Sequence, residues 1–385
     1  MTDADLARLQ QRALVVGGVA LMVSAAGAML DPGAFLGGWL ASFLFWLGIP
    51  LGCLVIIQLH YLSGGAWGVV VRRIAESAAA TIPLLALAFV PLAFGLRLVF
   101  VWARPEAVAV APDLQEKAAY LNVPFFLVRA LVYFAAWTAI ASILRRWSLR
   151  RDEVADPYPR RFRLFAGPGL VVYGLTITFA AIDWGMSLDP HWYSTAYPVM
   201  FGLGQVVSGF AFSIALAMAL REQEPFGRLV RPANLIDLGN LLLTFVLLWA
   251  YVSFAQFMLI WSGNIREETT WYLARETGGW LAVILVLMAA HFGLPFALLL
   301  HRPLKRDPRT LAAIALLVLA MRLLDCFWLV VPGIPGAHAF HWLYLTTPLA
   351  IGGLWAGAFV WRLRGVPLVP GNEPLVEQAM TAHGH

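Results

Sequence analysis

The stretch FAAIDWGMSLDPHWYST, residues 179–195, places two carboxylates and an imidazole at the end of a long apolar run. Asp183, Asp189 and His191 lie within nine residues of one another along the chain. A carboxylate whose pKa is raised by partial burial, close to an imidazole, can accept and release protons near neutral pH. The stretch therefore predicts a proton-handling site, with Asp183 as its leading proton acceptor.

Two tryptophans, Trp184 and Trp192, stand beside these polar residues. Aromatic side chains can enclose a flat ring such as a quinone, so both are candidate quinone contacts. A structural interpretation is also open, because Asp189 followed by Pro190 is a helix-start signal and tryptophans gather at membrane interfaces. Asp183 has no local helix end to cap, which favours a chemical role for it.

A second set of ionisable residues lies in later apolar segments. Arg322 and Asp325 are three residues apart, so on a helix they share a face and can pair. His291 lies near the middle of another apolar segment. We expect all three to belong to the proton-handling set, with Arg322 tuning Asp325. The alternatives are a structural ion pair for Arg322 and Asp325, and a packed, hydrogen-bonded side chain for His291.

A proton path would also need a mouth on the opposite side of the apolar region. His60, Glu76 and Asp237 lie at the other ends of apolar segments and are the candidates for this inner mouth. The alternative for each of them is an interfacial, purely structural position.

The composition shows which elements must position these residues. The chain has 385 residues, of which 61% are hydrophobic and only 13% charged, and its mean hydropathy is +0.75. A bilayer crossing takes about 20 apolar residues. The sequence therefore predicts an all-α, polytopic membrane protein. Ten runs are long enough to span: 13–30, 36–59, 79–101, 124–145, 164–186, 194–220, 235–262, 278–300, 311–331 and 342–362.

The basic residues give the predicted spans an orientation. With the N-terminus placed in the cytoplasm, 20 Lys and Arg fall in the inside segments and 4 in the outside loops. Because inside loops of membrane proteins carry the excess of Lys and Arg, both termini are predicted to be cytoplasmic. The net charge of +5 then records membrane orientation, and nucleic acid is excluded as a partner. Residues 1–364 form one membrane domain, and residues 365–385 are expected to be an extended cytoplasmic tail.

The number and placement of Cys and His residues limit which metal cofactors the chain can bind. The two cysteines, Cys53 and Cys326, lie in separate apolar segments and form no C-x-x-C motif, so iron–sulfur ligation and covalent haem attachment are unsupported. A b-type haem would need two His at matching depth on facing helices, and only His291 lies at mid-depth. No haem, iron–sulfur cluster or metal centre is therefore expected in this chain.

Three stretches carry a resemblance to a known family. They are AIDWGMSLDPHWYSTAYPVMF, LLWAYVSFAQFMLIWSGNIREETTWYLAR and HYLSGGAWGVVVRRIAE. Together they resemble one of the two large integral membrane subunits of bacterial alternative complex III, a quinol:electron-acceptor oxidoreductase. Both large subunits are of the polysulphide-reductase-anchor type, and the resemblance covers about residues 35–360.

The resemblance implies a fold, a location and partners. The fold would be two four-helix bundles, spans 2–5 and 6–9, flanked by spans 1 and 10, in a bacterial cytoplasmic membrane. The partners would be the sister membrane subunit of the same type, an extracytoplasmic iron–sulfur subunit, multihaem cytochrome c subunits and a terminal oxidase, besides lipid. The complex would oxidise quinol at the outer face, and quinone is the one cofactor implied for this chain.

Three function classes follow from these observations. The first is a subunit of a quinol-oxidising complex that contributes to a quinone pocket or to proton translocation and is not catalytic alone. The second is a purely structural anchor for peripheral redox subunits. The third is a secondary transporter, which would be expected to show broken helices and a polar site at mid-depth.

Overall fold

The computed structural model describes residues 3–154, 160–334 and 340–381, and in these ranges all regular secondary structure is helical. Ten segments there are long and apolar enough to cross a membrane, which confirms the number of spans predicted from the sequence. In chain order the spans are built by α1 (Asp3–Leu30), α2 (Pro32–Ser63), α3 (Ala66–Ala79) with α4 (Ile82–Ala88) and α5 (Val90–Phe94), α9 (Val123–Glu153), α10 (Arg160–Trp184), α11 (Ala196–Leu220), α12 (Pro232–Gly263), α14 (Trp280–Val286) with the π-helical turn η4 (Leu287–Gly293) and α15 (Leu294–Leu300), α17 (Pro308–Val330) and α18 (Leu343–Arg364).

Short helices occupy the connections between the spans, the last turns of two spans (η2 and η5) and the tail (α19). They are α6 (Leu96–Val99), η1 (Val101–Ala103), α7 (Pro105–Val110), α8 (Pro112–Lys117), η2 (Met186–Leu188), η3 (Phe226–Leu229), α13 (Arg266–Leu273), α16 (Arg302–Arg306), η5 (Val331–Gly333) and α19 (Pro374–Thr381).

Several spans begin at a side-chain cap followed by proline. Asp31 accepts a hydrogen bond from the backbone N–H of Ala34 at 2.8 Å, and Asn122 accepts one from that of Phe125 at 3.0 Å. Asp307 caps α17 in the same way through the N–H of Thr310. Proline occupies the first turn of each of these helices, where its missing N–H leaves no bond unmade. The local sequence thus fixes where these spans start.

Helices α2 and α11 form the centre of the molecule. The most apolar stretch of α2 is almost entirely buried, and α2 packs against α3, α10, α11, α17 and α18. A Cβ atom on Gly52 would lie 1.9 Å from the carbonyl oxygen of Gln205, and one on Gly209 would lie 2.5 Å from the carbonyl carbon of Gly52. The two backbones are therefore in direct contact, as small residues permit in membrane helix pairs.

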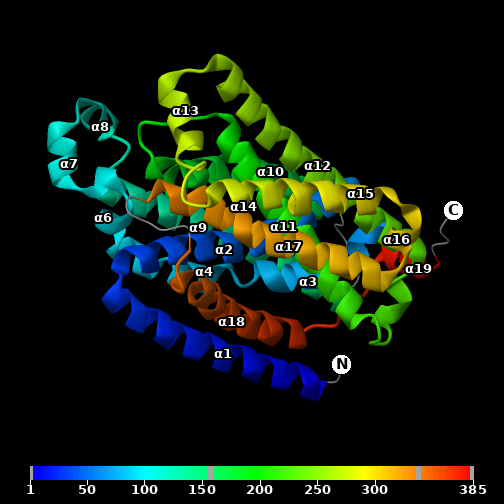
Figure 1. Cartoon of the computed structure of the whole chain (residues 1–385). Helices are drawn as coiled ribbons and strands as arrows, with labels where there is room; N and C mark the ends of the chain where they lie inside the picture. Colours follow the sequence, from blue (N-terminus) through cyan, green and yellow to red (C-terminus); the bar gives the residue numbers. More distant parts are fainter. Residues whose placement is uncertain (1–2, 155–159, 335–339, 382–385) are drawn as a thin grey trace.

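Helices α1 and α18 lie side by side along one flank of the molecule (Figure 1). A second close backbone approach joins them, because a Cβ atom on Gly353 would lie 2.4 Å from the Cα of Gly17. The opposite face of α1 is apolar and exposed at Val15, Val19 and Met22. An exposed apolar face of this kind suits contact with lipid.

The short helices gather at the two ends of the bundle. Figure 1 shows α16, α19 and the start of α1 at one end, and α6, α7, α8 and α13 at the other. The first and last described helices therefore meet at the same end of the bundle, as an even number of spans requires.

The structure corrects the prediction for the third span. The sequence predicts residues 79–101, whereas helix begins at Ala66, directly after Gly64 and Gly65, and the spanning segment reaches only Phe94. The predicted inner loop contains Arg72 and Arg73, but both are buried within α3 because acidic side chains from other elements neutralise them.

The tail also differs from the prediction. Residues 374–381 form the helix α19, which packs against α3, so the segment is not extended as expected. Residues 382–385 lie outside the described part of the chain.

Candidate functional site

Asp183, the leading candidate, lies at the end of α10 and is fully buried. Arg129 on α9 donates two hydrogen bonds to the Asp183 carboxylate, from Nε at 2.9 Å and from Nη2 at 2.8 Å. The hydroxyl of Tyr133 donates a third, at 2.8 Å. A bidentate arginine and a hydroxyl both stabilise the ionised form of a carboxyl group. Asp183 is therefore held in place by three side-chain donors from α9.

Arg129 is in turn held by its surroundings. Its guanidinium lies 3.9 Å from the ring centre of Tyr120 and 4.4 Å from that of Phe125, and Nη1 donates to the backbone carbonyl of Tyr120. Ser187 donates to the backbone carbonyl of Asp183 at 2.6 Å and completes the helix end. The pair thus joins α9, α10 and the segment before α9.

The two candidate quinone contacts lie inside aromatic clusters. Trp184 is buried against Phe43, Phe89 and Phe134, with ring centres 5.4–5.8 Å apart. Trp192 is buried and stacks on Trp271 at 4.9 Å, while its indole N–H donates to the carbonyl of Glu268. A quinone would reach either indole only after these neighbouring rings had moved.

Asp189 and His191 lie in the turn between α10 and α11, away from the Asp183 contacts. His191 is exposed, and its Nδ1 lies 2.5 Å from a carboxylate oxygen of Asp113 on α8. Lys117 donates to the carbonyl of Pro190 at 2.5 Å. Asp189 accepts a hydrogen bond from the backbone of His191 at 3.3 Å. An ion pair and a hydrogen bond at the surface therefore connect this turn to α8.

Arg322 and Asp325 form a buried ion pair on α17, which confirms the pairing predicted from their spacing. Nη2 of Arg322 also lies 3.8 Å from the sulfur of Cys326. Gly204 on α11 makes room for the guanidinium, because a Cβ atom there would lie 2.4 Å from Nη2 of Arg322. The pair is thus enclosed between α11 and α17.

His291 lies in the π-helical turn η4 and is fully buried. Both of its ring nitrogens lack a hydrogen-bond partner among the described residues, as do Nε1 of Trp249 and Nε of Arg322. The rings of His291 and Trp249 are 4.1 Å apart, and η4 packs against both α12 and α17. π-Helical turns occur often at functional sites. Buried polar groups are normally hydrogen-bonded, so these atoms mark an interior region with unused hydrogen-bonding capacity.

The inner-mouth candidates divide into two groups. His60 and Glu76 are buried, with Nε2 of His60 3.1 Å from the carbonyl oxygen of Gly65 and Glu76 accepting from Arg73 at 2.7 Å. Asp237, in the second turn of α12, is exposed. The structure thus buries two of the three candidates and leaves Asp237 at the surface.

Arg275, which the sequence places merely in an outer loop, is also buried. It donates to the backbone carbonyls of Trp271, Trp328 and Leu329 at 2.7–3.1 Å and lies 3.4 Å from the ring centre of Trp271. Burial lowers the pKa of Arg275 to about 9. Its contacts join α13 to the end of α17.

Arg129 is the most important residue that the sequence prediction missed. A signal was present, because Arg129 and Asp183 are opposite charges in consecutive predicted spans and each needs a partner in hydrocarbon.

The site residues therefore form separate groups and not one pocket. Within the described residues, no three His, Cys, Asp or Glu side chains are placed to hold a metal ion. No protein-family model matches the chain, and no curated protein is detectably similar to it in sequence.

Proposed function

We propose that the chain is a proton-handling membrane subunit of a quinol-oxidising electron-transfer complex of the alternative complex III type. The observation that carries the proposal is the buried group of His291, Arg322 and Asp325 within two candidate spans. Ionisable side chains at the bilayer centre cost about 2.5–3.5 kcal/mol each on insertion scales, and they usually mark ion or proton pathways. The resemblance of the three sequence motifs supplies the setting.

The contacts suggest different roles for the two buried aspartates. Asp183 has three donors on its carboxylate, so taking up a proton would break strong hydrogen bonds. Asp325 is paired with Arg322 of its own helix, and that helix packs against the turn that holds His291. We therefore assign proton exchange to Asp325 and His291, tuning of Asp325 to Arg322, and a positioning role to Asp183.

The proposal extends to the assembly. Spans 2–5 and 6–9 form the two four-helix bundles, both termini face the cytoplasm, and the membrane is a bacterial cytoplasmic membrane. The iron–sulfur and cytochrome c subunits bind at the opposite, outer face, beside the sister membrane subunit. The chain itself carries no electrons, and quinol oxidation is completed only in the complex.

The break in the third span gives no support to the transporter alternative. The third span breaks between α3, α4 and α5, yet the side chains that α4 and α5 bury there are Ile82, Leu85 and Leu92. A substrate site of a secondary transporter would need polar groups or free helix ends at such breaks.

Substitutions in the intact complex test the assignment. Asp325→Asn and His291→Phe are each expected to slow proton release coupled to quinol oxidation by about a hundredfold, the scale of a lost proton-transfer group. Proton release per electron and quinol oxidation rate would be measured together in the purified complex. His291→Phe removes no hydrogen bond that the described residues make, so this variant is expected to keep its fold.

Glu222→Gln serves as the matched control, since it removes an exposed carboxylate in the connection after α11 that belongs to no part of the proposed proton path. Unchanged rates and stoichiometry in folded Asp325→Asn and His291→Phe complexes would leave only the structural-anchor function. If the solubilised chain purified without haem-containing partners, both the proposed function and the structural-anchor function would be refuted.

A further inference from the structure

The segment 370–381, called here the tail segment, is bound to the end of the bundle by ionic contacts. The carboxylate of Glu373 accepts hydrogen bonds from Arg72 on α3 at 2.5 Å and from Arg151 on α9 at 3.0 Å. Burial would raise the pKa of Glu373, but the charges of Arg72 and Arg151 outweigh it and hold the pKa below its usual range. Glu373 is thus ionised and bridges two helices.

Backbone contacts fix the segment on both sides of Glu373. The N–H of Gly371 donates to Asp152 at 2.7 Å, and the side chain of Asn372 donates to the carbonyl of Arg151 at 2.9 Å. At the far end, Asn234 on α12 donates to the carbonyl of Ala379 at 3.0 Å. The segment therefore reaches across α3, α9 and α12.

Buried polar groups lie beneath the tail segment. Arg72 and Arg73 are 3% and 1% exposed, and Arg73 pairs with both Glu76 and Asp152. Since Asp152 also binds Gly371, the contacts of the tail continue directly into this buried network. His60, an inner-mouth candidate, is buried against α3, where a Cβ atom on Gly68 would lie 1.9 Å from its ring. Removal of the tail segment would open this network to water.

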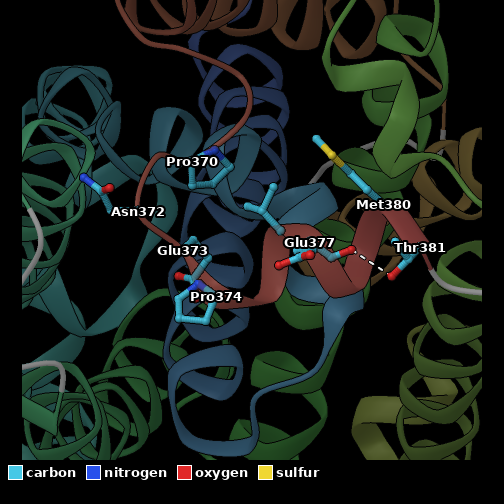
Figure 2. A pocket seen from close by; sticks show the side chains of 8 residues that line it. Pro370, Asn372, Glu373, Pro374, Glu377, Met380 and Thr381 are labelled. Atoms are coloured by element: carbon cyan, nitrogen blue, oxygen red, sulfur yellow. Dashed lines mark hydrogen bonds between the residues drawn. The ribbon is translucent and has the colours of Figure 1, made fainter.

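The apolar anchorage of the tail segment is partial, because Leu375, Val376 and Met380 pack against the core while only half-buried. Of the eight residues in α19, only Ala379 is buried. A groove of about 630 Å³ runs along the segment, and its lining residues all belong to the segment (Figure 2). Segments with few buried apolar contacts open at low free-energy cost compared with the core. The attachment thus combines these partial apolar contacts with the polar contacts centred on Glu373.

We propose that the tail segment is a removable seal over the inner polar network of Arg72, Arg73, Glu76 and His60, held closed by Glu373. Its opening admits water to these side chains, and its closure excludes water. That this network is the inner mouth of a proton path rests on the proposed function, whereas the sealing does not.

Thiol labelling of the full-length chain tests the seal. A reporter is introduced by Ser77→Cys in a Cys53→Ala, Cys326→Ala background, because Ser77 is fully buried one turn beyond Arg73 and its hydroxyl has no hydrogen-bond partner among the described residues. With a water-soluble maleimide, Glu373→Gln is expected to raise the labelling rate by about tenfold, as expected when charge-assisted hydrogen bonds are lost from the closed state. Glu377→Gln, which changes an exposed glutamate of the same tail segment, is the control and should leave the rate unchanged.

Equal labelling in the parent and Glu373→Gln chains would overturn the proposal, as would an equal rise with Glu377→Gln. Hydrogen exchange of the parent chain gives an independent check, even where Glu373→Gln does not fold. The amides of residues 371–381 should exchange at least about a hundredfold faster than those of α2. Exchange as slow as in α2 would make the segment a fixed part of the core. Neither measurement needs turnover, so failure here is distinct from failure of the proposed function.

Discussion

Asp183→Asn is expected to destabilise the folded chain by about 3–5 kcal/mol, the usual loss when one partner of a buried ion pair is removed. The reason is that Arg129, itself buried, would keep its charge without the carboxylate that now accepts two of its hydrogen bonds. The free energy of unfolding would be measured by denaturant titration in mixed micelles. The expected loss of unfolding free energy is a large fraction of the stability of a typical folded chain.

The matched control is Asp189→Asn, six residues further along and in the partly exposed turn. Its contact is a single long hydrogen bond to a neighbouring backbone N–H, so its expected effect is within about 0.5 kcal/mol. The double variant Arg129→Met, Asp183→Leu should recover much of the loss, because no buried charge remains unpaired. Equal losses from Asp183→Asn and Asp189→Asn would contradict the assignment of Asp183 as a fixed counterion.

Gly52→Ala is expected to abolish the folded state or to weaken it by more than about 3 kcal/mol, beyond the usual range for an overpacked site. The added Cβ would lie 1.9 Å from a backbone oxygen of α11, and a backbone cannot turn aside as a side chain can. The two central helices would have to separate. Thermal melting and the yield of monodisperse protein in detergent would measure the effect.

Gly174→Ala provides the comparison for this prediction, since nothing lies within 4 Å of a Cβ atom at that position of α10. There the change should be neutral or slightly stabilising, because alanine favours helix over glycine by about 1 kcal/mol. Similar melting temperatures for the two variants would show that α2 and α11 are not held at the distance described.

The number of spans was predictable because it depends on local properties of the sequence. Apolar length and caps such as Asp31 act through neighbouring residues, and α17 pairs Arg322 with Asp325 within one helical turn. The third span was predicted wrongly for the opposite reason. Arg72 and Arg73 make residues 66–79 look like a loop. Besides the local Glu76, the carboxylates that neutralise them are Glu373 and Asp152, which are distant in the sequence.

In the candidate site, too, local features were predictable from the sequence and contacts between distant residues were not. Asp183 was singled out by its depth in an apolar run, but its partner Arg129 lies 54 residues earlier and depends on how α9 packs against α10. The burial of Arg275 is equally invisible in the sequence, because its partners are backbone carbonyls supplied partly by α17. The residue types thus indicated which apolar segments carry charged side chains, whereas tertiary packing determines the partners of each charged side chain.

The π-helical turn at Leu287–Gly293 fixes the rotational phase of its span. A π-turn holds one more residue than an α-turn, and each residue of an α-helix rotates the chain by about 100°. Deleting one residue there would convert the wide turn into ordinary α-helix, and the turn would lose the geometry in which it now holds His291 in the interior. The span therefore consists of two α-helices joined by one wider turn, and the length of that turn sets the position of its histidine.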